Sequence, residues 1–284
     1  MTHGGGQWRY SGDMSVNHGD RSAAARGLGR RHALGLVGAA AAALATGAER
    51  SQPIVRPFVL VHGAWHGAWC WERLTPLLSA RGFWAVAPCL AGVGERAKEI
   101  GPHITLDTHV EETIALLNAW QMSDVILVGH SYAGAVITGV ADRVPWLLRK
   151  LVYLDAVIPE PGKSLNGGTA QPNTSPSNRA VMPAVSPQSL GITDPADAAW
   201  AARRLTAHPI NTFDQPIRIA SPIGNGVPGA YIACTRPAMM PHAKYAAFVR
   251  TRPDWRMLEL ATGHEAMITA PRQLAAMLVD LAGD

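Results

Sequence analysis

Cysteine is scarce in this sequence. The three cysteines, Cys70, Cys89 and Cys234, lie far apart in a chain of 284 residues, and none belongs to a Cys-x-x-Cys pair or to a Cys/His spacing typical of metal ligands. This pattern argues against a disulfide framework and against a zinc site. We therefore predict no metal ion, and we expect the three thiols to be reduced and buried.

Long apolar runs and an excess of charge of one sign are also missing. No stretch approaches the roughly 20 apolar residues of a membrane-spanning helix, so we expect no stable membrane insertion. Outside residues 1–49 the chain holds 20 basic and 18 acidic residues without a basic cluster, which gives no case for a nucleic-acid partner. The hydrophobic fraction of 48% suits a compact soluble domain, whose oligomeric state the sequence leaves undetermined.

The first 49 residues differ in composition from the rest. They are rich in Gly, Ala and Arg, and Arg30-Arg31 stands directly before the weakly apolar run Ala33–Ala45. This order resembles a twin-arginine export signal, which predicts a periplasmic or extracellular protein. The alternative is a disordered Ala-rich extension with a chance Arg pair, which would leave the protein in the cytoplasm.

Six short apolar runs recur along the rest of the chain. Continuous apolar runs are typical of strands that are buried on both faces. Helical patterns separate them, as at Trp71–Ala80 and at Thr108–Trp120, where Thr108 and Glu111 have the form of a capping box. The alternation predicts an α/β fold with a roughly six-stranded, mainly parallel, doubly wound sheet. The expected strands are Phe58–Val61, Trp84–Ala87, Val125–Val128, Leu151–Leu154, Gly229–Cys234 and Trp255–Leu260.

One interval interrupts this alternation. Residues 159–228 are dense in Pro, Ser, Asn and Gly, with one expected helix at Ala196–Ala207. We interpret this interval as a cap inserted into a core formed by residues 50–158 and 229–284. Ligands of such sheets bind beyond the carboxyl ends of the strands, where an insertion would roof the crevice.

A candidate nucleophile follows the third apolar run. The run leads through Gly129 and His130 to Ser131 and then into a helix-like segment. A serine on so sharp a strand-to-helix turn has a strained backbone and needs small residues two positions to either side. Here these are Gly129 and Ala133, the latter in place of the usual second glycine. We predict that Ser131 is the nucleophile of an acyl-transfer reaction.

The same chemistry requires backbone donors for a developing oxyanion. We expect one donor to be the N–H of Tyr132, directly after the serine. The second follows the first apolar run, where Gly63 can bend the chain so that the N–H of Ala64 faces the site. The pair His62-Gly63 can also be an ordinary turn.

Two motifs in the sequence resemble those of one α/β-hydrolase branch, which contains plant methylesterases, hydroxynitrile lyases and bacterial pyrethroid-type carboxylesterases. They are Val61-His62-Gly63-Ala64-Trp65-His66-Gly67-Ala68-Trp69 and Gly129-His130-Ser131. The resemblance covers residue 57 to the C-terminus and is weakest through the cap. It implies an α/β-hydrolase fold and a cofactor-free Ser-His-Asp enzyme that acts on esters of modest size.

The base is expected near the end of the chain. Of eleven histidines, only His264 lies between the last predicted strand and the final helix, in the order Ser, acid, His that the fold uses. We predict that His264 takes the proton of the serine. The alternative is that His264 merely caps the loop.

The acid has several candidates. The resembled branch usually carries it near the position of Pro237, but no carboxylate lies between Asp214 and Asp254. We predict Asp155, which ends the fourth run, because an anion is needed to fix the imidazole tautomer and to stabilise the imidazolium. Asp155 can also be a turn residue, and the rival acids are Glu265, Asp254 and Glu259.

A partly aromatic, apolar pocket is expected beside these groups. Its candidate lining residues are Trp65, His66, Met240 and Met267, and each of the two methionines can equally belong to the core. The expected partner is a small-molecule ester. One rival is a lyase of the same fold, although hydroxynitrile cleavage in the resembled branch goes with a Thr where Ala64 stands and a Lys near the base, and both are absent. The other rival is a ligand-binding protein with low turnover, which a missing acid would favour.

Overall fold

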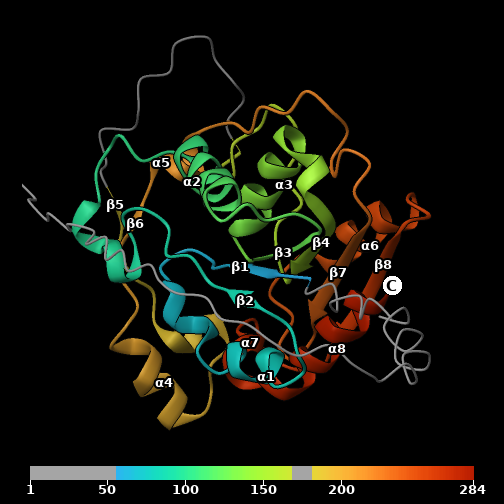
Figure 1. The fold of residues 1–284 in the computed structure, drawn as a ribbon. Helices are drawn as coiled ribbons and strands as arrows, with labels where there is room; N and C mark the ends of the chain where they lie inside the picture. The colour runs from blue at the N-terminus through green and yellow to red at the C-terminus, as the bar shows by residue number, and fades with distance from the viewer. Residues whose placement is uncertain (1–55, 168–180) are drawn as a thin grey trace, which may run out of the picture. The chain divides into compact units, whose positions relative to one another are not determined.

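Six parallel strands form the central sheet of the computed structural model, which describes residues 56–167 and 181–284 (Figure 1). The predicted export signal in residues 1–49 lies outside these ranges. The strand order is β2-β1-β3-β4-β7-β8, and every neighbouring pair is parallel. This confirms the predicted α/β fold class. The strands are β1 (Phe58–Val61), β2 (Ala85–Val86), β3 (Val125–His130), β4 (Leu148–Leu154), β7 (Gly229–Cys234) and β8 (Trp255–Leu260).

Helices cover both faces of the sheet, which explains the continuous apolar runs. Val59 and Val61 of β1 pack into the core beneath α2 and α3, whereas Phe58 and Leu60 pack into the core beneath α1 and α8. In Figure 1, α2 and α3 lie on one side of the sheet and α1, α7 and α8 on the other. These helices are α1 (Thr75–Ser79), α2 (Leu106–Ala119), α3 (Ala133–Arg143), α6 (His242–Arg250), α7 (Ala266–Thr269) and α8 (Pro271–Gly283). None of the helices within the described ranges has the length and apolar character that a membrane span requires.

Two predicted helix starts were wrong. The capping box of α2 is formed by Thr105 and Thr108, whose side chains each accept a hydrogen bond from the other's amide. Glu111, the predicted partner, instead forms an ion pair with Arg143 of α3. The helix expected at Trp71–Ala80 is divided, because a 3₁₀ turn ends at Trp71 and α1 begins only at Thr75, beside a proline that fits the first turn of a helix.

The interval 159–228 contributes no strand to the central sheet in the part that the structure describes. The helix predicted at Ala196–Ala207 ends at Ala202. Beyond it, Thr206 lies against the loop after β1, where its amide donates to the carbonyl of Trp65 at 3.0 Å instead of to a helical carbonyl. The division of the chain into core and cap stays a prediction. Elements of the interval are β5 (Val181–Met182), α4 (Pro195–Ala202), β6 (His208–Pro209) and α5 (Asn211–Asp214).

The three cysteines are free thiols, as expected. Cys70 and Cys234 are buried, but Cys89 is only partly buried, so the expectation of burial was wrong for that residue.

Candidate active site

Three side chains that follow different strands meet at the carboxyl edge of the sheet. Ser131 follows β3, Asp155 follows β4, and His264 lies in the turn after β8. Nε2 of His264 lies 2.9 Å from Oγ of Ser131, and Nδ1 lies 2.6 Å from Oδ2 of Asp155. Because an ionised carboxylate only accepts hydrogen bonds, Nδ1 carries the proton and Nε2 accepts from the serine hydroxyl. In this tautomer the imidazole is ready to remove the proton of the hydroxyl.

Ser131 is held in a strained turn between β3 and α3. Its φ of 55° lies in the left-handed region, which a residue with a side chain rarely adopts. Two amides hold the turn by donating to the carbonyl of Ser131, from Gly134 at 3.2 Å and from Val157 at 3.0 Å. The backbone therefore presents the hydroxyl at the tip of the turn, as the sequence motif predicts.

The small residues around the serine are closely packed, as the motif predicts. A Cβ on Gly129 would lie 2.7 Å from the carbonyl oxygen of Ala133, so glycine is required there. The second close approach is at Gly134, where a Cβ would lie 2.0 Å from the carbonyl oxygen of Val157. Ala133 is accommodated as a fully buried residue, as expected, and Gly134 adds a glycine requirement that the sequence analysis did not single out.

The loop after β1 lies against the serine. A Cβ on Gly63 would lie 3.0 Å from Cβ of Ser131 and 2.8 Å from Nδ1 of His130, so only glycine allows this approach. This approach also brings the next residue, Ala64, close to Ser131. Among the described residues, no hydrogen bond engages the amide of Ala64 or that of Tyr132. Their role as oxyanion donors stays a prediction.

Buried histidines form hydrogen bonds with the two residues that carry these amides and with the neighbouring Trp65. His66 Nδ1 donates to the carbonyl of Ala64 at 2.7 Å, and the amide of Trp65 donates to Nδ1 of His208 at 3.3 Å. The hydroxyl of Tyr132 donates to Nδ1 of His109 at 3.0 Å. Burial lowers the pKa of His109 to about 4 and that of His208 well below its usual range. Both rings are therefore neutral at physiological pH, as acceptors must be.

Asp155 is completely buried at the end of β4 and accepts three hydrogen bonds. Besides His264, the donors are the amide of Cys234 at 2.9 Å and Nε2 of His242 at 2.6 Å, both to Oδ1. Burial by itself would raise the pKa of the carboxyl, but the bonds from His264, Cys234 and His242 outweigh it and hold the pKa below its ordinary value. Asp155 is therefore the anion behind the base.

His242 is a site residue that the sequence analysis missed. It is the first residue of α6, five residues after Pro237, near which the resembled branch usually carries its acid. The resemblance pointed to the neighbourhood of Pro237, but His242 itself was only one histidine among eleven.

The three rival acids do not contact the base ring. The carboxylate of Glu265 is completely buried and lies 3.2 Å from Nε2 of His66. Burial would raise its pKa, but the charge of His66 outweighs this and lowers it to about 2. The pKa of His66 is raised in return, because Glu265 outweighs the effect of burial. Asp254 precedes β8 at the amino edge of the sheet, and Glu259 is exposed.

The predicted pocket residues divide into two groups. Met267 is completely buried in the core beneath α8, and His66 is buried between Trp69 and Glu265. A packing role describes both better than the predicted pocket-lining role. Trp65 and Met240 are partly exposed and pack against the core on the other face of the sheet, so their place in a pocket stays a prediction.

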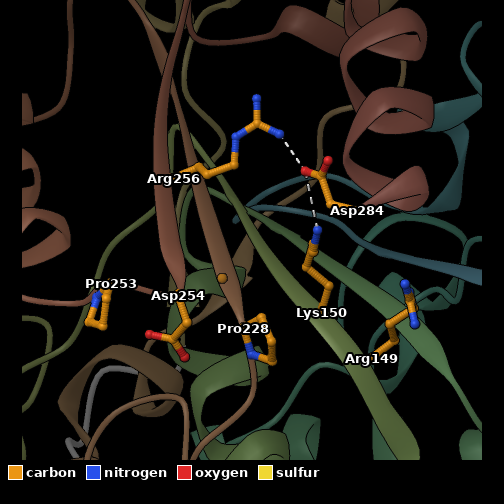
Figure 2. A pocket seen from close by; sticks show the side chains of 8 residues that line it. Arg149, Lys150, Pro228, Pro253, Asp254, Arg256 and Asp284 are labelled. Atoms are coloured by element: carbon orange, nitrogen blue, oxygen red, sulfur yellow. Dashed lines mark hydrogen bonds and ion pairs between the residues drawn. The ribbon is translucent and has the colours of Figure 1, made fainter.

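A cavity of about 390 Å³ lies at the opposite edge of the sheet (Figure 2). In it, Asp284 lies between Arg256 and Lys150 and forms ion pairs with both. Lys150 lies five residues before Asp155 along β4, which corresponds to about 16 Å at the rise of a strand. This cavity therefore cannot serve the three residues described above. It is lined by Arg149, Lys150, Pro228, Gly229, Pro253, Asp254, Arg256 and Asp284.

One group of metal-type donors lies at the site. Donor atoms of His130, His264 and Glu265 lie within 4.8 Å of one another. Both ring nitrogens of His264 are already bonded to Ser131 and Asp155. The Nε2–H of His130 donates to the carbonyl of His264 at 3.0 Å, which fixes the loop of the base. The group therefore has an evident role in placing the base, and the predicted absence of a metal stays a prediction.

Comparison with known proteins gives one family. A profile described as "Alpha/beta hydrolase family" matches residues 58–277. A carbendazim hydrolyzing esterase of Nocardioides sp. (strain SG-4G) is 34% identical over 248 residues, which are 79% of this chain and 98% of that protein. An alpha-hydroxynitrile lyase of Arabidopsis thaliana is 39% identical over 104 residues, only 36% of this chain and 40% of that protein.

Among solved structures, a methylesterase from Arabidopsis is 26% identical, with a TM-score of 0.64, and the match covers 81% of this chain and 99% of that one. A pyrethroid hydrolase from Sphingobium faniae is 21% identical with a TM-score of 0.62, over 80% of this chain and 97% of that one, which shows a shared fold. The resemblance stated from the two sequence motifs is confirmed.

Proposed function

Since the chain belongs to the alpha/beta hydrolase family, we propose that it is a serine esterase that cleaves a carboxylic ester through an acyl-enzyme on Ser131. The observation that carries this proposal is the continuous pair of hydrogen bonds from Ser131 through His264 to Asp155, at 2.9 Å and 2.6 Å. The substrate we propose is a small to medium, largely apolar ester, in keeping with the partly exposed Trp65, which directly follows the proposed oxyanion donor Ala64.

The reaction begins with His264 taking the hydroxyl proton as Oγ of Ser131 attacks the ester carbonyl. The amides of Ala64 and Tyr132 stabilise the oxyanion, and the protonated imidazole then gives its proton to the leaving alcohol. Water, deprotonated by the same imidazole, attacks the acyl-enzyme and releases the acid. Asp155 stays ionised throughout and stabilises the imidazolium in both steps.

The test is hydrolysis of p-nitrophenyl esters of short and medium acyl chains, with carbendazim added to the panel because a relative is named for hydrolysing it. We expect turnover of at least one ester and its loss in Ser131→Ala, whereas Ser79→Ala, at an exposed serine that ends α1, retains it. A fluorophosphonate is expected to label the wild-type protein and not Ser131→Ala. Full turnover by Ser131→Ala would contradict the proposal.

The same panel separates this function from that of a lyase. Release of cyanide from a hydroxynitrile without turnover of any ester would favour the lyase. Labelling of Ser131 without turnover of either substrate class would favour a binding protein.

We also propose that residues 1–49 direct export by the twin-arginine route, on the strength of Arg30-Arg31 and the weakly apolar run behind it. Fusion of these residues to a reporter that is active only outside the cytoplasm tests the proposal. Replacing Arg30 and Arg31 together by lysine is expected to abolish the activity of the reporter. A reporter that stays active in this double variant would refute export by the twin-arginine route.

A further inference from the structure

The carboxylate of Asp155 lies between two imidazole rings. His264 Nδ1 lies 2.6 Å from Oδ2, and His242 Nε2 lies 2.6 Å from Oδ1. A Ser-His-Asp site needs only one of these contacts. The second ring comes from α6, which packs on the sheet through Tyr245 and Val249 and is not otherwise part of the site.

The two rings differ in their access to solvent. The side chain of His264 is 4% exposed and that of Asp155 is completely buried, whereas that of His242 is 16% exposed. Of the two rings on the buried carboxylate, His242 is therefore the one more exposed to solvent.

We propose that His242 is a positioning residue of the triad, which fixes the rotamer of the Asp155 carboxylate and makes its support of His264 dependent on pH. The proposal rests on the function proposed above. A neutral His242 donates one hydrogen bond and leaves Asp155 with its full negative charge. A protonated His242 neutralises that charge, so the carboxylate stabilises the imidazolium of His264 less well, and the two rings compete for one anion.

The other groups around His242 keep a constant charge near neutral pH. Burial raises the pKa of Tyr231, whose ring lies 6.2 Å from that of His242, and that of the Cys234 thiol. Burial likewise raises the pKa of Tyr245, on the next turn of α6.

The nearest exposed charges are paired. Glu160 forms ion pairs with Lys163 and with Lys244 of α6, and hydrogen bonds from the two lysines lower its pKa to about 2. His130, whose ring lies 4.6 Å from that of His264, stays neutral because burial lowers its pKa to about 3. Both ring nitrogens that bond to the Asp155 carboxylate belong to imidazoles, the side-chain type that responds to pH near neutrality.

The experiment is the pH profile of kcat/KM for wild type, His242→Gln and His242→Leu. Under the proposal, the charge of a protonated His242 opposes protonation of His264 across the shared carboxylate and so extends activity to lower pH. Both variants remove this charge, so we expect the acid limb to move up by about one pH unit, the lower end of the effect of a charge at 4–6 Å. Glutamine can still donate to Oδ1, so we expect it to restore part of the kcat that His242→Leu loses at high pH.

His103→Gln is the matched control, because His103 is exposed and contacts neither ring, and its profile is expected to superimpose on that of wild type. A merely structural role of His242 would lower kcat at every pH without moving the acid limb. The proposal would be overturned if the acid limbs of both His242 variants coincided with the acid limb of wild type.

A substrate-free measurement keeps the proposal separate from the proposed function. The titration of the His264 ring is followed by NMR in wild type and in His242→Gln, and we expect its midpoint to rise by about one pH unit in the variant. Equal midpoints would overturn the proposal even if the protein is an esterase. A shifted midpoint without ester turnover would support the coupling and refute the esterase function instead.

Discussion

Replacement of Asp155 by asparagine tests the chemistry of the site with little change of shape. Asp155 has a φ of 42°, in the left-handed region that asparagine tolerates better than other residues with a side chain. Asparagine therefore fits the backbone, whereas alanine would add backbone strain to the loss of the carboxylate.

The contacts of Asp155 determine which way the new amide points. Oδ1 accepts from the amide of Cys234 at 2.9 Å, and a backbone amide can only donate. The carboxamide oxygen must therefore occupy the Oδ1 position, and its NH₂ group must face Nδ1 of His264. That ring then accepts at Nδ1 and carries its proton on Nε2, which faces Ser131 and can no longer take the hydroxyl proton.

We expect kcat to fall by about 10⁴-fold, the size of the loss when a triad aspartate becomes asparagine and the tautomer is reversed. This corresponds to roughly 5 kcal/mol of barrier. KM is expected to change little, because Asp155 is completely buried behind the base.

The assay is initial-rate hydrolysis of the best p-nitrophenyl ester, with the thermal unfolding midpoint as a check of folding. A kcat within tenfold of wild type in a folded Asp155→Asn protein would refute the reasoning and move the acid role to another carboxylate.

Two further predictions concern the loop after β1 and the buried ion pair behind it. Gly63→Ala places a Cβ 2.8 Å from Nδ1 of the buried His130, so we expect a loss of about 1–3 kcal/mol in the free energy of unfolding and a lower kcat. Urea unfolding and ester hydrolysis measure these two effects. Gly283→Ala, where the added Cβ meets open space, is the neutral control. Glu265→Gln leaves His66 without its buried partner and is expected to cost about 3–5 kcal/mol in urea unfolding. The depressed pKa of Glu265 gives stability that is present above pH 4.5 and is lost as pH falls toward about 2, whereas the raised pKa of His66 gives stability that is present below pH 6.5 and is lost as pH rises through that raised pKa. The cost of Glu265→Gln should therefore be largest between pH 4.5 and 6.5. An equal cost at pH 5.5 and pH 9 would contradict the ion pair.

The sheet and the nucleophile could be predicted from the sequence because both depend on residues that are neighbours in the chain. A strand buried on both faces is apolar at every position, as Phe58–Val61 shows, and all six predicted runs became strands of the sheet. The turn at Ser131 likewise needs small residues close by in sequence. The order of the elements then placed His264 after the last strand, without any knowledge of distances.

Other features depended on contacts between distant segments. Thr206, expected inside the helix at 196–207, bonds instead to Trp65, and Gly134 is required because the carbonyl of Val157 packs against it. Neither partner can be recognised from local composition.

The sequence by itself determined the fold class and predicted the candidate nucleophile and base, because local burial patterns and chain order in a parallel sheet leave few arrangements. The sequence favoured Asp155 as the acid, and the tertiary structure brings this carboxylate to the base. Only the tertiary structure decided that Glu265 pairs with His66 and that a second histidine lies on Asp155. The physical reason is that these are pairings of single atoms at the ends of separate strands, where a difference of a few ångströms selects one partner and no pattern along the chain records it.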